Sequence, residues 1–193
     1  MAEKEVCVEN LSKSYGGVPV LRNVSFVAGP GVTCIMAPSG MGKTTLLRVL
    51  LGLESPDSGR VKVPKNCRWT AVFQEDRLLE QLDAMGNLRF VLGGDFREEA
   101  AAELLRELGL EDTGHKKVRD FSGGMKRRLA LARALLAPSD ALVLDEPFTG
   151  LDEENRERAI GCIRRLASGK PVLLVTHDEP DALGLDANIL RLS

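Results

Sequence analysis

Residues 32–53 read VTCIMAPSGMGKTTLLRVLLGL, and this stretch decides the class of fold. It begins with a continuous apolar run, Val32–Ala37, of the kind found in a strand that is covered on both faces. It ends with Thr44–Leu53, whose leucines recur at helical spacing and predict an amphipathic helix. A glycine-rich loop joins the two. A strand that leads through such a loop into a helix is typical of a mostly parallel α/β sheet.

The loop itself, Ala37–Thr44, predicts a binding site for phosphate groups. Its glycines allow backbone N–H groups to close around phosphate oxygens, and the helix N-terminus adds a partial positive charge. Lys43 would then reach the β and γ phosphates of a nucleotide, and the hydroxyl of Thr44 would bind Mg²⁺. The alternative is a glycine-rich turn that contains a lysine by chance. Ala37 replaces the usual first glycine, so we expect it to have a negative φ.

A second strand ends in two carboxylates, since residues 141–146 read ALVLDE. Ligands of open α/β sheets bind at the carboxyl ends of strands. Asp145 would hold Mg²⁺, directly or through water, and Glu146 would polarise the attacking water. Taken alone, an exposed acidic turn after a core strand would explain this pair. Together with the phosphate-binding loop, the pair predicts a site of nucleotide hydrolysis.

Segments on either side of these motifs extend the α/β pattern. Apolar and polar residues alternate from about residue 4 to 37, which predicts strands. Pro56–Gly59 has the composition of a turn. Further strands are expected at residues 67–73, 141–144 and 172–176, with a helix at 153–167.

Residues 76–138 differ in character and are expected to be helical. Glu99–Leu110 and Gly123–Leu136 both carry apolar residues at helical spacing. A helical insert would therefore interrupt a mostly parallel sheet. We expect a single domain over residues 1–193, with an α/β core of residues 1–75 and 139–193 and a helical subdomain of residues 76–138.

Composition excludes several classes of protein. The chain has 193 residues, of which 44% are hydrophobic and 28% charged, as in an ordinary globular domain. The net charge of -2 gives no basic field for nucleic acid. No apolar run approaches the ~20 residues of a transmembrane helix, and no signal peptide is indicated, so work at a membrane would require partners that cross it. The four cysteines lack CxxC spacing and are expected to be reduced thiols rather than zinc ligands.

The stretch FSGGM at residues 121–125, followed by KRRLALARA, narrows the interpretation. It closely resembles the signature motif of ABC ATPases, which is usually LSGGQ. Ser122, Gly123 and Gly124 would form a second phosphate-binding nest at a helix N-terminus. The resemblance implies that this nest faces the ATP bound by another subunit. Met125 replaces the usual glutamine, which we expect to cost a polar contact without inactivating the site.

Four further segments match the same family in its order along the chain. Tyr15 resembles the aromatic residue that stacks on adenine, although an ordinary loop tyrosine is the alternative. Gln74 resembles the glutamine that senses Mg²⁺ and couples to membrane subunits. Thr149–Asp152 matches a loop that contacts the opposite subunit. His177 matches the histidine that hydrogen-bonds the γ-phosphate.

The resemblance implies the ABC ATPase fold, with an antiparallel β subdomain beside the parallel sheet, and a subunit that hydrolyses ATP with Mg²⁺ to drive a transporter. Expected partners are transmembrane permease subunits, a second copy that completes an ATP sandwich and, indirectly, an extracytoplasmic solute-binding protein, without nucleic acid. The expected location is the cytoplasmic side of the membrane. The expected catalytic residues are Glu146 and His177, and the Mg²⁺ ligands Thr44, Gln74 and Asp145. The expected nucleotide-binding residues are Tyr15, Pro38, Ser39, Gly40, Met41, Gly42, Lys43, Thr44, Thr45, Gln74, Ser122, Gly123, Gly124, Asp145 and Asp152.

The transported solute is less closely defined. Residues 73–79, FQEDRLL, together with the Gly-Gly-Met of the signature, resemble ATPases of nitrate, sulfonate and taurine importers, a family that includes thiamine-precursor importers. We therefore expect a bacterial importer of a small solute. A soluble ABC ATPase, for example in iron–sulfur cluster assembly, is the alternative. A P-loop kinase would leave the signature and His177 unexplained.

Overall fold

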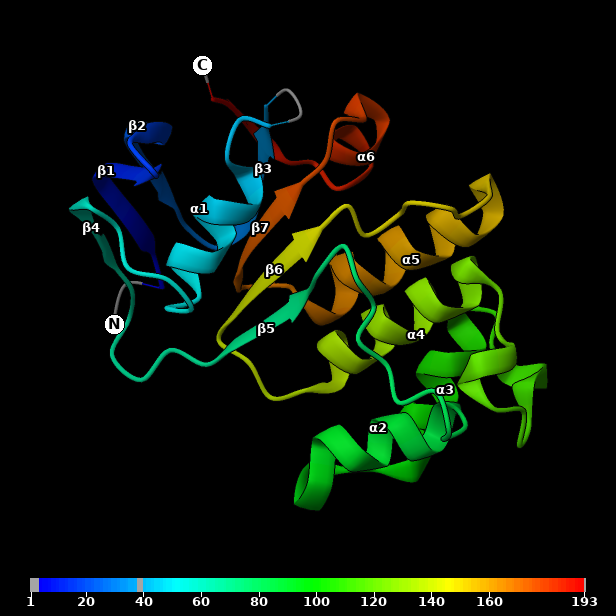
Figure 1. Ribbon diagram of the computed structural model, residues 1–193. Coiled ribbons are helices and arrows are strands. Elements are labelled where there is room, and N and C mark those ends of the chain that lie inside the picture. Colours follow the sequence, from blue (N-terminus) through cyan, green and yellow to red (C-terminus); the bar gives the residue numbers. More distant parts are fainter. Residues whose placement is uncertain (1–3, 38–39, 193) are drawn as a thin grey trace.

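A five-stranded parallel sheet forms the centre of the computed structural model, which describes residues 4–37 and 40–192 (Figure 1). The strand order is β5-β6-β7-β3-β8, and every pairing is parallel. This confirms the predicted α/β class. The strands are β3 (Gly31–Met36), β5 (Trp69–Val72), β6 (Ala141–Asp145), β7 (Pro171–Val175) and β8 (Asn188–Arg191).

A separate three-stranded antiparallel sheet lies beside it, with the order β2-β1-β4. Its strands are β1 (Val6–Tyr15), β2 (Val18–Ala28) and β4 (Ser58–Lys62). Helix α1 (Lys43–Leu50) lies between the two sheets (Figure 1), and its buried leucines share one apolar cluster with Val8 of β1 and Val175 of β7. The antiparallel sheet is thus anchored to the parallel one through α1.

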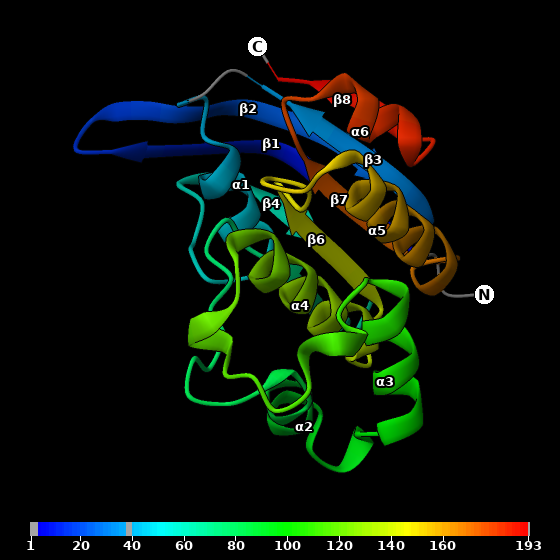
Figure 2. The ribbon, with the colours of Figure 1, turned by 90° about the vertical axis from the view of Figure 1, so that its right-hand side faces the viewer.

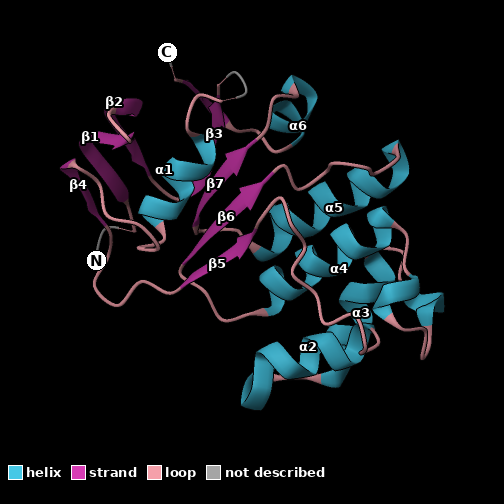
Figure 3. Cartoon of the chain, viewed as in Figure 1, coloured by secondary structure: helices cyan, strands magenta, loops and turns pink. Residues whose placement is uncertain are grey.

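The helices α2 to α5 gather on the other face of the parallel sheet (Figures 2 and 3). Side chains of β6 alternate between the faces: Leu142 and Leu144 pack with these helices, whereas Val143 packs with α1. The helical part therefore shares a core with the sheet. The helices are α2 (Ala84–Leu92), α3 (Glu98–Glu107), α4 (Gly123–Leu136), α5 (Glu153–Leu166) and α6 (Glu179–Gly184), with 3₁₀ turns at Gly93–Asp95, Glu111–Thr113 and Val118–Asp120.

Two boundaries differ from expectation. The turn predicted at Pro56–Gly59 overlaps β4, which already begins at Ser58. Gly59 has φ 81°, and a Cβ there would lie 2.3 Å from the carbonyl oxygen of Asn10. Glycine at this position therefore allows β4 to lie close to β1. The helix predicted to reach Leu53 ends at Leu50, because Gly52 adopts φ 69° just beyond it. The subdomain boundaries at residues 76 and 138 stay a prediction.

Candidate active site

The phosphate-binding loop lies between the end of β3 and the start of α1. Gly40 and Gly42 have φ values of 84° and 77°, in the left-handed region that favours glycine. A Cβ at Gly42 would also lie 2.8 Å from the carbonyl oxygen of Val20, so a larger residue would displace the β2 backbone. Pro38 and Ser39 lie outside the described residues.

Ala37 does not have the positive φ that would make its side chain a source of strain. It is absent from the non-glycine residues with positive φ in the described part of the chain, as predicted. Its carbonyl oxygen accepts a hydrogen bond of 2.6 Å from Nζ of Lys43. The lysine side chain therefore folds back over the loop that would hold phosphate.

A cleft of about 420 Å³ opens beside this lysine, within the size range of small-molecule sites. It brings together loop residues and residues from the ends of β5 and β6. Met41 points elsewhere and lies with Leu192 and Val20 in a neighbouring hollow. The residues lining the cleft are Val20, Gly40, Gly42, Lys43, Thr44, Thr45, Gln74, Asp145 and Glu146.

Asp145 and Glu146 follow each other at the carboxyl end of β6 but occupy different environments. Asp145 is only 5% exposed, and burial, followed by the nearby charge of Glu146, raises its pKa. Glu146 has φ 49°, which is uncommon for a residue with a Cβ. Its N–H donates to the carbonyl oxygen of Val175 at 2.8 Å. A buried carboxylate beside Thr44 provides the oxygen ligands that Mg²⁺ prefers.

His177, which follows β7, reaches the same carboxylate. Its Nδ1 lies 2.9 Å from Oε1 of Glu146, and this hydrogen bond raises the pKa of His177. The ionised carboxylate can only accept, so Nδ1 donates. Nε2 stays available for a phosphate oxygen, because the side chain is 77% exposed.

The signature residues line a second cleft, of about 580 Å³. Ser122 caps α4, and its Oγ accepts a hydrogen bond from the N–H of Met125 at 3.2 Å. Asp152 caps α5 in the same way, through the N–H of Asn155 at 2.9 Å. Gln74 lines both clefts, whereas Ser122, Gly123, Gly124 and Asp152 line only the second one. One copy of the chain thus keeps its two phosphate-binding nests apart.

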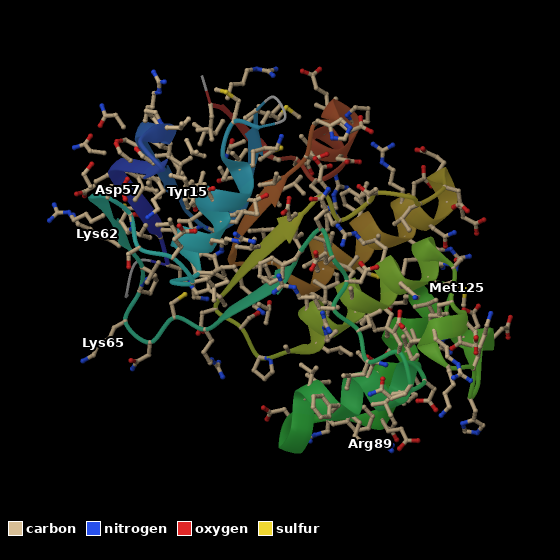
Figure 4. The ribbon with its side chains drawn as sticks, viewed as in Figure 1. Tyr15, Asp57, Lys62, Lys65, Arg89 and Met125 are labelled. Atoms are coloured by element: carbon tan, nitrogen blue, oxygen red, sulfur yellow. The ribbon has the colours of Figure 1, made fainter. Side chains whose placement is uncertain are left out.

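Tyr15 is not brought into either cleft. Its hydroxyl donates to Oε1 of Glu54 at 2.5 Å, and Nζ of Lys13 lies 5.5 Å from the centre of its ring. Figure 4 shows Tyr15 in the region of the antiparallel sheet, well separated from Met125 on α4. The residue is 44% exposed. Stacking on adenine stays a prediction.

The sequence reasoning missed one residue that reaches this site, Arg127. Its side chain is buried and bonds to the backbone at the end of β6 and to the loop after β5. The available signal was its helical register, since it lies four residues before the buried Leu131 on the core face of α4. An arginine on a core-facing position needs partners, and these come from other elements.

Comparison with known proteins places the chain in a family. Residues 21–149 match the family model described as ABC transporter. The chain is 41% identical over 192 residues to the aliphatic sulfonates import ATP-binding protein SsuB of Delftia acidovorans, covering 97% of this chain and 79% of that protein. The chain belongs to the ABC transporter family.

Other ABC relatives carry the likeness further. The taurine import ATP-binding protein TauB of Pseudomonas fluorescens (strain Pf0-1) is 35% identical, with 96% of this chain and 76% of that protein covered. The Fe(3+) ions import ATP-binding protein FbpC of Brucella abortus (strain 2308) is 37% identical, and this chain spans 57% of its length. The dimeric structure of MJ0796, a bacterial ABC transporter cassette, matches with TM-score 0.83 and 28% identity over 96% of this chain and 94% of that one. Like the family it belongs to, this ABC chain is an ATPase.

Proposed function

We propose that this ATPase is the motor subunit of a bacterial importer of a small solute, a sulfonate or taurine by its relatives' names. The observation that carries the proposal is the convergence of Lys43, Asp145, Glu146 and His177 at one edge of the parallel sheet. The relatives named as import ATP-binding proteins support the transport role. An FbpC relative of similar identity shows that likeness alone does not fix the solute.

Each group has a role that follows from its chemistry. Lys43 and the loop N–H groups bind the phosphates, and Glu146 orients water and accepts its proton. His177 donates to the γ-phosphate through its exposed imidazole. Thr44, Gln74 and Asp145 would hold Mg²⁺, which would neutralise phosphate charge. Mg²⁺ commonly keeps several waters and binds through one or two carboxylates together with substrate phosphates, which this small set of ligands would allow.

Partners follow from the two separate clefts. A second copy of the chain would place its Ser122 nest over the nucleotide bound at Lys43, and two such sites would close together. The dimeric MJ0796 cassette supports this arrangement. Permease subunits would dock near Gln74, with a solute-binding protein acting outside the cell. None of the helices within residues 4–37 and 40–192 is long and apolar enough to span a membrane. We place the chain on the cytoplasmic face through its permease.

The test is ATP binding and hydrolysis by the purified chain, alone and with its permease in liposomes. We expect Mg²⁺-dependent hydrolysis and solute uptake that requires ATP. In Lys43→Ala, ATP affinity should fall by at least tenfold, because the only side-chain charge on the β and γ phosphates is removed. Unchanged nucleotide binding by calorimetry would overturn the site. Co-purification with a soluble scaffold protein instead of a permease would overturn the transport role.

A further inference from the structure

Arg127, on α4, is a buried charge whose partners lie on other elements. The residue is 4% exposed. Its Nη2 donates to the carbonyl oxygens of Asp145 and Glu146, both at 2.6 Å, and its Nε donates to that of Glu146 at 3.2 Å. Its Nη1 donates to the carbonyl oxygen of Phe73 and, at 3.0 Å, to Oδ1 of Asp76. All three nitrogens of the guanidinium are therefore in use.

The backbone that Arg127 holds is the strained backbone of Glu146. A residue with a Cβ occupies the left-handed region, here at φ 49°, only when its surroundings fix it there. At Glu146 the N–H donates to the carbonyl oxygen of Val175, and the carbonyl oxygen accepts from Arg127 and, at 3.3 Å, from the N–H of Thr149. The two peptide groups set the direction of the Cα–Cβ bond. They therefore aim the carboxylate, whose Oε1 lies 2.9 Å from Nδ1 of His177.

The same guanidinium also holds the loop that contains Gln74. Phe73 and Asp76, which flank this glutamine, are both bonded to Nη1. One cation on the signature helix thus ties the loop after β5 to the residue after β6. Arg127 does not line the cleft beside Lys43, so it has no contact there with nucleotide. It does line the second cleft, together with Ser122. Its influence on hydrolysis beside Lys43 of the same copy must therefore act through Glu146 and Gln74.

We propose that Arg127 is a positioning residue for ATP hydrolysis, which fixes Glu146 in its left-handed conformation and couples it to the Gln74 loop. This rests on the proposed function, in which Glu146 orients the attacking water. A purely structural tie between helix and sheet is the alternative. The two differ in what a conservative substitution changes: geometry at Glu146, or stability alone.

The chain offers a matched control in Arg133, also on α4. Its Nη1 and Nη2 donate to the carbonyl oxygens of Arg77 and Asp76 at 2.7 and 2.8 Å, so it holds the same loop without a bond to Glu146. Lysine at either position keeps the charge but has no planar fork to span several carbonyls. Arg127→Lys and Arg133→Lys therefore differ in the contact with Glu146.

The experiment measures kcat, KM for ATP, melting temperature and the imidazole titration of His177 by NMR in wild type and both variants. We expect kcat of Arg127→Lys to fall about tenfold to a hundredfold, the loss that a misplaced catalytic group produces, with KM within about twofold. The pKa of His177 should fall as the carboxylate moves away. Arg133→Lys should keep kcat and the titration of His177.

Equal kcat in Arg127→Lys and wild type would overturn this proposal while leaving the proposed function intact. A second result would also overturn it: both variants lose kcat in proportion to their loss of melting temperature, while the pKa of His177 stays unchanged. If Arg127→Lys does not fold, Asp76→Asn provides the second variant, because it weakens one anchor of Arg127 and should lower kcat in the same direction without raising KM. An unchanged kcat in Asp76→Asn would then overturn the coupling. An inactive wild type would instead contradict the proposed function.

Discussion

Two consecutive carboxylates at the end of β6 show how neighbouring residues of one type acquire different roles. Asp145 is buried, and its pKa is raised by the loss of solvent and by the charge of Glu146. Glu146 has a left-handed backbone, and its side chain, 15% exposed, meets His177. Environments that separate two carboxyl groups in this way are typical of sites where one binds a cation and the other handles a proton.

Glu146→Gln should change the titration of His177. The amide can still accept a hydrogen bond but carries no charge, so the pKa of His177 should fall toward its ordinary value of 6.5. The measurement is an NMR titration of the imidazole signals. The signals of His115, which lies beside Asp83 instead, should superimpose in the two proteins. A His177 titration that is unchanged in the variant would contradict the bond to Glu146.

The raised pKa of His177 also makes the stabilisation by its ion pair with Glu146 depend on pH. Because the folded-state pKa lies above the unfolded one, the pair stabilises the fold fully below about pH 6.5 and loses this contribution as pH rises through the folded pKa. The imidazole of this pair is 77% exposed, so the effect of the pair on stability should be small. The difference between the free energies of unfolding of wild type and Glu146→Gln, measured as a function of pH, should show this decline.

Ala37→Gly should leave ATP affinity within about twofold. The Ala37 group that contacts Lys43 is its carbonyl oxygen, which glycine retains. The backbone there needs no positive φ, so glycine gains nothing and adds chain entropy to the unfolded state, at about 0.5–1 kcal/mol of stability. Calorimetry of ATP binding and thermal unfolding measure the two effects. A large gain in affinity would show that the alanine constrains the loop.

At the scale of elements, the site is built from strand ends that the sheet brings into line. In the parallel register Asp145 pairs with Val175 and Val175 pairs with Ile35, so Glu146, His177 and the loop after β3 come to one edge. This meeting of carboxyl ends could be predicted from sequence, because apolar runs mark the strands and the polar residues follow them. The second cleft, at the start of α4, followed from the glycines after Ser122.

The parts that could not be predicted depend on contacts between distant elements. Strand β4 has little apolar pattern and exists because β1 pairs with it, whereas α6 and β8 are too short for periodicity to mark. The bonds of Arg127 to the β6 end and to Asp76 arise only when α4 packs on the sheet. No local pattern encodes which carbonyl a buried arginine reaches.

One such contact supports the segment that carries His177. Oγ1 of Thr176 donates to Oδ2 of Asp181 at 2.9 Å, and Nη2 of Arg156 lies 2.6 Å from Oδ1 of the same carboxylate. Asp181→Ala would leave a hydroxyl and a mostly buried cation without this partner. We expect the free energy of unfolding to fall by about 1–3 kcal/mol. Each kcal/mol corresponds to a decrease of about 2–4 °C in melting temperature.

The control for Asp181→Ala is Glu154→Ala on α5. Glu154 pairs with Arg158 at 2.7 Å on the helix surface, where such a pair contributes about 0.3–0.5 kcal/mol. Its melting temperature should therefore change little. Asp181→Ala should also raise KM or lower kcat, because the segment with His177 loses its anchor. Equal melting temperatures in the two variants would contradict the role of Asp181 as the anchor of this segment.

At the scale of the whole molecule, the proposed ATP sandwich would divide a single composite site between two copies. The cleft beside Lys43 and the cleft beside Ser122 share Gln74 but contain different phosphate-binding nests. Figure 2 shows α1 and α4 as separate helices. Under this proposal each copy would bind nucleotide alone, and a second copy would cover it. Association should then depend on ATP and end when ATP is hydrolysed.

Glu146→Gln should convert this transient association into a stable one. The amide keeps the shape of the side chain but is far less basic, so ATP should bind normally while hydrolysis slows severely. ATP would then persist between Lys43 of one copy and Ser122 of the other. Size-exclusion chromatography should show a dimer of the variant with Mg²⁺ and ATP and a monomer with ADP. The wild-type chain should run mainly as a monomer in both.

Adding Ser122→Arg to this variant should abolish the dimer, because the arginine side chain places bulk and a charge where the facing γ-phosphate must fit. Ser168→Arg is the matched control: Ser168 is exposed and precedes β7, at the edge of the sheet opposite the site, so the dimer should persist. If Glu146→Gln stays monomeric at saturating ATP, the measurement is repeated with the permease, scoring trapped nucleotide. If ATP is trapped in the presence of the permease, the dimer closes only when it is bound to the permease. If ATP is not trapped, Glu146 is not the catalytic carboxylate.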